Sequence, residues 1–272
     1  MASMRRYASL LAALPLAFAV ARADAACERP FSVPVALTGF SLMAKGDSFT
    51  GVYPELLRGF EARSSCRFTL SLVPRARQEA LFVGGYSDLL LPASRTPARE
   101  RFGYFVPLIA NRATAIHFNA RQPPLHSVAE LLANKSLRVA LVRGFDYGDV
   151  YQAMMKELQA QGRLMLETTP VDVARRLQAG MADLTLMAPS IMIGALVTDT
   201  RVAAMAADMR TEALDDLPWG ESGVYISRSS VSAQDRAALE KLFTGAVKSG
   251  AVWDAFKRHY PPDVLNSGIR PR

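Results

Sequence analysis

Cysteine and histidine are scarce in this sequence. Its 272 residues include two cysteines and three histidines. His117, His126 and His259 share no ligand spacing with one another or with a cysteine. Structural and catalytic metal sites use such residues at short, recurring intervals. The sequence therefore predicts no metal site, and no motif in it implies a cofactor.

Concentrated positive charge and hydrolase motifs are also missing. The formal net charge is +7, but lysine and arginine are spread along the chain with acidic residues among them. Nucleic-acid-binding proteins concentrate basic residues in a patch or stripe, so nucleic acid is not an expected partner. The segment Trp219-Gly-Glu-Ser-Gly223 lacks the spacing of a nucleophile elbow.

Long hydrophobic runs are absent after the first 25 residues. Residues 1–25 combine a cationic start at Arg5 and Arg6, an apolar run over 8–21 and the small residues Ala23-Asp-Ala25. This pattern is typical of a cleaved secretory signal, and the run is short for a membrane span. Cleavage after Ala25 removes three arginines and one aspartate, so the formal charge falls from +7 to +5. We expect a soluble mature protein in the periplasm.

The two cysteines fit an exported protein. Cys27 and Cys66 each lie just ahead of a predicted strand, at 31–37 and 67–73. If these strands are parallel neighbours, their starts are adjacent, and an even cysteine count in an oxidising compartment favours a disulfide. Two free buried thiols are the alternative.

Predicted strands and helices alternate along the rest of the chain, which is typical of an α/β fold with a mostly parallel sheet. We expect strands at 31–37, 67–73, 88–91, 112–119, 137–142, 164–168, 183–186 and 223–227. We expect the main helices at 52–63, 75–83, 146–161, 189–196 and 250–259, with another following Ser232. The stretch 92–107 is polar and is predicted to be irregular.

One helix–glycine–aspartate–strand unit occurs twice. Gly85-x-x-Asp88 and Gly180-x-x-Asp183 each follow a predicted helix and lead into an apolar strand. Glycine ends a helix at little cost because it accepts positive φ. The repeat predicts two similar lobes with a cleft between them. We expect both aspartates to bind backbone amides rather than to form a catalytic pair.

Four motifs in order resemble the family of periplasmic solute-binding proteins that serve amino-acid-type ABC importers. The motifs begin with Gly51-Val-Tyr-Pro-Glu-Leu-Leu57, followed by Gly85-x-x-Asp88 with Ser94-Arg-Thr-Pro-Ala-Arg-Glu-Arg101 and Phe105-Val-Pro107; then come Ser127-Val-Ala-Glu-Leu131 with Leu137-Arg-Val-Ala-Leu-Val-Arg-Gly144, and Leu177-Gln-Ala-Gly-Met-Ala-Asp183. The resemblance covers essentially the whole mature chain. It implies a two-lobed α/β fold with two hinge crossings, near Asn119 and near 215–218.

The resemblance also implies a division of the chain and a function. Residues 26–118 and 217–272 would form lobe 1, and residues 119–216 an inserted lobe 2. The expected function is capture of a small carboxylate-bearing, amino-acid-like solute by hinge closure. The expected protein is a monomer that delivers its solute to an ABC transporter membrane subunit.

Eight residues are candidates for ligand binding. In the family, the residue equivalent to Arg99 clamps the ligand's carboxylate, a role that suits a planar guanidinium. The hydroxyls of Thr96 and Ser94 would assist it, and Phe40 would act as an aromatic lid. Gly144, Phe145, Asp146 and Tyr147 would meet the ligand from lobe 2.

Several of these assignments have alternatives. Arg99 would otherwise belong to a solvated loop, Asp146 would cap a helix, and the two aromatic residues would pack the helix start. Arg75 and Arg77, after Pro74, either reach the cleft or solvate a helix face.

One position departs from the family pattern. Amino-acid binders usually carry an acid for the ammonium group after the second Gly-x-x-Asp strand, where this chain has Ala188. Either Asp146 or another acid supplies the counter-charge, or the solute is not a standard α-amino acid. A rival interpretation is an enzyme on the same scaffold that dehydrates cyclic carboxylic acids, with Glu55, Glu79 or Asp146 as general acid. A third is a ligand-presenting partner of a membrane sensor.

Overall fold

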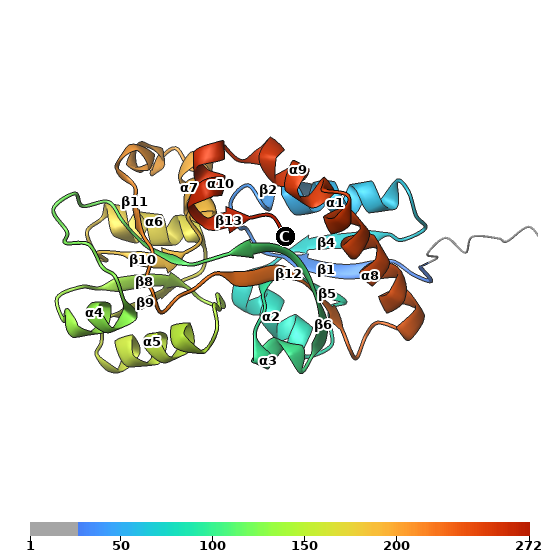
Figure 1. Ribbon diagram of the computed structural model, residues 1–272, viewed down its shortest axis with the longest axis horizontal. Helices are drawn as coiled ribbons and strands as arrows, with labels where there is room; N and C mark the ends of the chain where they lie inside the picture. Colours follow the sequence, from blue (N-terminus) through green and yellow to red (C-terminus); the bar gives the residue numbers. More distant parts are fainter. Residues whose placement is uncertain (1–26) are drawn as a thin grey trace, which may run out of the picture.

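Two lobes joined by long strands make up the described part of the chain. The structure, a computed structural model, describes residues 27–272, so the predicted signal at 1–25 lies outside the described residues. Strands β6 (Gly103–Asn111) and β12 (Gly220–Ser227) run side by side toward the second lobe (Figure 1). The predicted two-lobed α/β fold is confirmed. No helix among the described residues is long and apolar enough to cross a membrane.

Lobe 1 begins with a parallel strand pair that a disulfide closes at one end. Strand β1 (Phe31–Val35) pairs in parallel with β4 (Phe68–Leu72). Cys27 and Cys66 are bonded to each other, with their Cα atoms 4.8 Å apart, so the predicted disulfide is confirmed. The remaining elements before the crossing are a small hairpin, three helices and a strand: β2 (Met43–Lys45), β3 (Ser48–Thr50), α1 (Val52–Glu61), α2 (Arg75–Val83), β5 (Leu89–Ser94) and α3 (Pro97–Glu100).

The second sheet of lobe 1 is antiparallel and extends into the crossing. Its strand order is β13-β6-β12-β5, where β13 comprises Ile269–Arg270. The segment predicted to be irregular, 92–107, instead contains the end of β5, the helix α3 and half of β6. Strand β12 lies between β5 and β6 and pairs with both, so residues more than a hundred positions apart stabilise this segment.

Lobe 2 repeats the parallel pair and adds its own antiparallel sheet. Strand β8 (Val139–Val142) pairs in parallel with β9 (Leu164–Glu167), and β7 (Thr114–His117) lies between β10 (Thr185–Met187) and β11 (Arg210–Glu212). Its helices are α4 (Val128–Ala133), α5 (Asp149–Ala160), α6 (Pro170–Gln178), α7 (Pro189–Thr198) and the 3₁₀ helix η1 (Ala203–Asp208). Each lobe is therefore mixed rather than mostly parallel.

The chain changes lobes earlier than predicted. Strand β7 pairs with two strands of lobe 2, so the change of sheet comes at residues 112–113, ahead of the predicted boundary after residue 118. The return to lobe 1 falls between β11 and β12, which includes the predicted crossing at 215–218.

The last segment reaches back across both lobes. Helices α8 (Ala233–Lys248) and α9 (Ala251–His259) cover lobe 1, and α10 (Pro262–Gly268) then packs against α7 of lobe 2. Strand β13 returns to the crossing, where Ile269 pairs with Asn111. The guanidinium carbon of Arg270 lies 3.9 Å from the ring centre of Trp219. A third strand therefore accompanies β6 and β12 at the crossing.

The two lobes bury different cores. Lobe 1 has one large apolar cluster rich in aromatic residues, in which Phe60 meets Phe243 edge-on at 5.0 Å. Lobe 2 has two smaller clusters on opposite sides of its sheet, one around Leu141 and Leu186 and one around Val142 and Met187.

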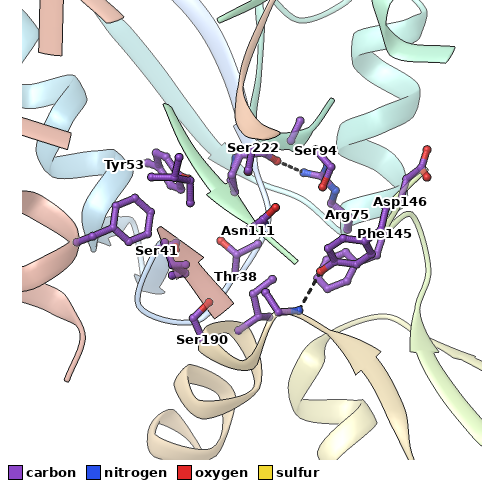
Figure 2. Close-up of a pocket in the computed structure, with 18 residues that line it drawn as sticks. Thr38, Ser41, Tyr53, Arg75, Ser94, Asn111, Phe145, Asp146, Ser190 and Ser222 are labelled. Atoms are coloured by element: carbon purple, nitrogen blue, oxygen red, sulfur yellow. Dashed lines mark hydrogen bonds between the residues drawn. The ribbon is translucent and has the colours of Figure 1, made fainter. Parts of the chain in front are cut away.

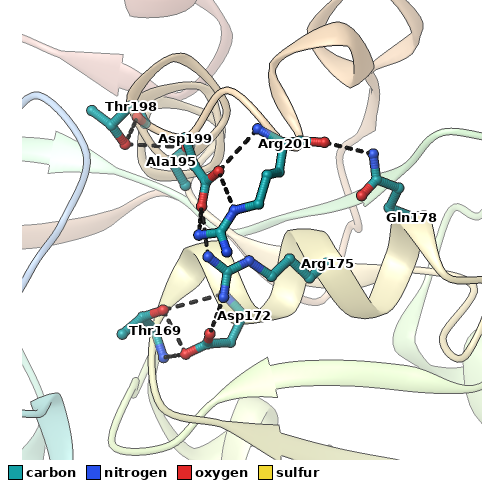
Figure 3. Close-up of polar contacts among 9 residues, drawn as sticks. Thr169, Asp172, Arg175, Gln178, Ala195, Thr198, Asp199 and Arg201 are labelled. Carbon is teal, nitrogen blue, oxygen red and sulfur yellow. Dashed lines mark hydrogen bonds and ion pairs between the residues drawn. The ribbon is translucent and has the colours of Figure 1, made fainter.

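Charged networks supplement the smaller cores of lobe 2. Figure 3 shows Asp199, at the end of α7, accepting hydrogen bonds from Arg175 of α6 and from Arg201. Thr169 and Asp172 form a reciprocal capping box at the start of α6. The Arg175–Asp199 pair joins α6 to the end of α7.

Candidate functional site

A pocket lies between the two lobes, at the crossing strands (Figure 2). Lobe 1 contributes residues from the loop after β1, from α1, α2 and β5, and from β6, β12 and β13. Lobe 2 contributes the turn before α5 and the start of α7. The cavity volume is about 50 Å³, enough for a few water molecules at roughly 10–15 Å³ each. The arrangement suits a solute of few heavy atoms.

Hydroxyl and amide groups dominate the polar lining. They belong to Thr38, Ser41, Ser94, Asn111, Ser190 and Ser222. Thr38 is 3 % exposed, and its Oγ1 has no hydrogen-bond partner among the described residues. The Ser41 hydroxyl, in contrast, lies 2.8 Å from the Tyr260 hydroxyl. A buried hydroxyl without a hydrogen-bond partner is costly. The unpaired Thr38 hydroxyl therefore indicates that a bound ligand would place a polar group beside it.

Arg75 is the guanidinium in the pocket wall. It is the first residue of α2 and is 5 % exposed. Its Nη1 donates to Gln78 Oε1 at 2.7 Å and to the Pro92 carbonyl at 2.8 Å. Its Nε reaches the Gly144 carbonyl of lobe 2 at 3.4 Å. These contacts fix the side chain, so its charge is held at the lobe interface.

The second nitrogen of that guanidinium, Nη2, is less constrained. Its closest acidic contact is Glu79 Oε2 at 3.8 Å, longer than a hydrogen bond. Burial lowers the pKa of Arg75 to about 10, as does the nearby Arg99. Arg75 therefore stays cationic at neutral pH, and an anion near Nη2 would be favoured.

Arg99 lies behind the pocket wall and does not line the pocket. It is 2 % exposed, and its Nε and Nη2 donate to the two Glu79 carboxylate oxygens at 2.9 Å each. Its Nη1 donates to the Ser94 carbonyl at 3.0 Å. Thr96 caps α3 by accepting from the backbone N–H of Arg99. The short helix thus directs Arg99 back toward α2, where Glu79 lies between it and Arg75.

The wall from lobe 2 is aromatic. Phe145 and Tyr147 both line the pocket, with ring centres 6.3 Å apart and edge-on. The Tyr147 hydroxyl accepts a hydrogen bond from the backbone N–H of Ala188 at 3.2 Å. Burial raises the pKa of Tyr147 to about 12. The hydroxyl is therefore neutral, and its own hydrogen remains available for donation.

Asp146 lies at the edge of the pocket. Its Oδ1 accepts the backbone N–H of Gly148 at 2.9 Å. Figure 2 shows its carboxylate directed away from Asn111 and Thr38. Helix α5 begins at Asp149 with Gly148 as N-cap, so Asp146 does not cap it as one interpretation of the sequence proposed. The turn holds Asp146 in place.

Glycines form the contacts where the lobes touch beside the pocket. A Cβ atom on Gly194 of α7 would lie 2.2 Å from the Gly39 Cα, and one on Gly144 would lie 2.9 Å from the Ala76 Cα. Real Cβ atoms do not approach backbone this closely. Only glycine therefore permits this approach of the lobes.

Half of the predicted site residues line the pocket. Ser94, Phe145, Asp146 and Tyr147 do so, whereas Arg99, Thr96, Phe40 and Gly144 do not. Phe40 packs its ring edge-on against Tyr260 at 5.4 Å. Gly144 lies beside the pocket and offers its carbonyl to Arg75.

Sequence reasoning missed most of the lobe 1 lining. Arg75 follows Pro74, and from the sequence it could either reach the cleft or lie on a solvated helix face. Tyr53 lies in the recognised motif at 51–57, yet the motif did not predict its place in the pocket. No group of three or more His, Cys, Asp or Glu among residues 27–272 is arranged to hold a metal ion.

Comparison with solved structures shows what this fold is similar to. No protein-family model and no curated protein sequence matches the chain. An arginine-, lysine- and histidine-binding protein from Geobacillus stearothermophilus superimposes with a TM-score of 0.68 at 13% identity, over 88% of this chain and 99% of that one. A histidine kinase sensor domain with similarity to periplasmic binding proteins gives 0.67 at 18% identity, over 85% and 96%.

A third solved structure is also similar to this chain. It is an ancestral amino-acid-binding protein described as a precursor of cyclohexadienyl dehydratase, with a TM-score of 0.65 at 12% identity, over 85% of this chain and 95% of that one. Identities this low show a shared two-lobed fold, and the chemistry of the pocket must be argued from its own residues.

Proposed function

We propose that this protein is a solute receptor that captures a small carboxylate-bearing molecule between its lobes. The observation that carries the proposal is the pocket itself, in which Arg75 of lobe 1 faces Phe145 and Tyr147 of lobe 2. A guanidinium with one under-used nitrogen suits a carboxylate oxygen. The hydroxyls around it supply further donors.

The electrostatics favour an anion of low charge. Arg75 and Arg99 contribute two positive charges, and Glu79 and Asp146 contribute two negative ones. A single carboxylate next to Arg75 is therefore accommodated better than a dianion. A micromolar dissociation constant corresponds to about −8 kcal/mol, which one charge-assisted hydrogen-bond pair and burial of a small apolar part can supply.

Capture would proceed by closure of the lobes around the crossing strands. A ligand that touches both lobes stabilises the closed form relative to the open form. Gly39 of lobe 1 and Gly194 of lobe 2 are in close contact in this structure, and closure would bring them together. The affinity for the ligand would therefore depend on the close approach of the Gly39 and Gly194 backbones.

The test measures ligand-induced thermal stabilisation of the chain from residue 26 onward, with small monocarboxylates as probes. Ligand at a hundred times its dissociation constant adds about 2.7 kcal/mol to stability. We expect Arg75→Met to abolish the shift and Arg77→Met, an exposed arginine on the same helix, to retain it. A shift that survives Arg75→Met would overturn the proposed role of Arg75.

A second pair of variants tests closure separately. We expect Gly194→Ala to weaken binding at least tenfold while the apo protein keeps its stability. Gly245→Ala is the matched control, because this helical glycine has open space around its Cβ position. Equal affinity in the two variants would contradict the closure mechanism.

The proposed destination of the solute is a membrane partner, either an ABC importer subunit or a sensor. The solved neighbours include binding proteins and a sensor domain. The dehydratase alternative finds less support in the pocket. Glu55 pairs with Arg258 and His259, Glu79 pairs with Arg99, and only Asp146 of the three candidate acids lines the pocket.

A further inference from the structure

The pocket has few charged groups. Among the described lining residues, Arg75 and Asp146 alone carry charged side chains. The free amino group of an α-amino acid is an ammonium ion with three donors, and burying it without acceptors is costly. A pocket that binds an α-amino acid therefore needs acceptors for the hydrogen bonds of this ammonium ion.

Asp146 is poorly placed for that role. One of its oxygens is used by the Gly148 N–H at 2.9 Å. Its carboxylate points away from the hydroxyl side of the pocket (Figure 2). The side chain is also partly exposed, so water already solvates its charge.

The wall opposite Arg75 offers an apolar group and a donor. Ala188 is 2 % exposed and presents a methyl group. The Tyr147 hydroxyl oxygen already accepts from the Ala188 N–H, which leaves its hydrogen for donation. An ammonium ion on the ligand would therefore face a hydrogen-bond donor and a methyl group here. A ligand hydroxyl could instead accept a hydrogen bond from the Tyr147 hydroxyl.

Apart from Arg75, the polar lining from lobe 1 is neutral. The Thr38 hydroxyl is buried without a hydrogen-bond partner among residues 27–272, and the Asn111 carboxamide also lines the pocket. These groups can pair with a ligand hydroxyl. They can also accept from an ammonium ion, but they do not neutralise its charge.

We infer that the pocket selects a small 2-hydroxy or unsubstituted carboxylate and rejects the corresponding α-amino acid, with Tyr147 and Ala188 setting this selectivity. The inference rests on the proposed function, because it takes Arg75 as the carboxylate site. It narrows the solute class from amino-acid-like molecules to organic acids that lack an ammonium group.

The experiment is calorimetric titration with matched pairs that differ only in hydroxyl or ammonium. The pairs are glycolate and glycine, L-lactate and L-alanine, and L-malate and L-aspartate. We expect at least one hydroxy acid to bind tenfold or more tightly than its amino acid. The variant Ala188→Asp adds a carboxylate beside Tyr147, and we expect it to narrow or reverse that ratio.

The outcomes separate the inference from the proposed function. Equal or tighter binding of the amino acid overturns the inference and leaves solute capture intact. If the amino acid binds and Asp146→Asn abolishes its binding, then Asp146 is the counter-charge and the inference is wrong. Failure of every carboxylate to bind would overturn the carboxylate proposal itself. The wild-type titrations decide the matter even if Ala188→Asp does not fold.

Discussion

The two Gly-x-x-Asp units build the same backbone geometry with different partners. In lobe 1, the Asp88 carboxylate accepts the backbone N–H of Ser32 at 2.7 Å, and the Asp88 N–H donates to the Ser32 carbonyl. In lobe 2, Asp183 makes the same two bonds to Arg138, with 2.7 Å to its N–H. The predicted structural role of both aspartates is confirmed.

The arginine that neutralises each carboxylate differs. Asp88 binds Arg29, which lies two residues before β1, through both terminal guanidinium nitrogens at 2.7 and 2.8 Å. Asp183 binds the side chain of Arg138 itself. The Asp88 side chain is 4 % exposed and that of Asp183 is 30 % exposed. In lobe 1 the backbone bonds and the ion pair therefore come from two residues, Ser32 and Arg29, whereas in lobe 2 Arg138 supplies both.

Removal of the disulfide should lower the free energy of unfolding more than any other change considered, and should act mainly on lobe 1. Cys27 and Cys66 are 39 residues apart in sequence, and a loop of that size is worth about 4 kcal/mol. We expect the double variant Cys27→Ser, Cys66→Ser to lose free energy of unfolding of that order. Urea unfolding measures it, and amide exchange should show β1 opening while β8 stays protected. Equal loss of protection in both strands would contradict lobe-specific anchoring.

Neutralising Asp88 should destabilise the protein more than neutralising Asp183. The Asp88 side chain is buried but that of Arg29 is 43 % exposed. Hydrogen bonds to charged groups contribute about 1.5–3 kcal/mol, so we expect Asp88→Asn to lose stability in that range. We expect Asp183→Asn to lose less, because water screens its partly exposed pair. Thermal and urea unfolding of the two variants provide the measurement. Equal losses would show that the shared backbone bonds, rather than the arginines, carry the stability.

Acid should reduce the difference between wild type and Asp88→Asn. Burial alone would raise the pKa of Asp88, but hydrogen bonds from Arg29 and Ser32 outweigh it, and the pKa lies below its ordinary value. A lowered folded-state pKa contributes stability above the unfolded value, about 3.9, and loses it as pH falls through the folded value. The stability gap should therefore be full at pH 7 and shrink below about pH 4. A gap that is constant with pH would contradict the ionic contribution.

The sequence predicted best what is local. The helix ends at Gly85 and Gly180, the buried strands after them and the cysteine pair all depend on neighbours within a few residues or on adjacent strand starts. The strand β6 was missed because its partner β12 lies far along the chain and Pro107 interrupts its pattern. The polarity of the segment before it favoured a loop.

The pocket was predicted only in part because side-chain direction depends on tertiary contacts. Arg99 and Arg75 are both arginines near the cleft, and only their packing distinguishes them. Glu79 draws Arg99 behind the wall, while Gln78 and Pro92 hold Arg75 in it. The turn at 144–148 was recognised from its glycines, which lie at positive φ.

The third strand at the crossing would, if the proposed lobe closure occurs, influence affinity from outside the pocket. Strand β13 is paired with β6 at Ala110 and Asn111, and Arg270 stacks on Trp219 of the returning crossing. Any bend of β6 must therefore be shared by β13 and resisted by that stack. Apparent affinity scales with the fraction of molecules that can adopt the binding-competent form. Under the proposed function, substitutions at Trp219 or Arg270 would change the stiffness of the crossing, and so would shift the ligand affinity without altering the residues that line the pocket.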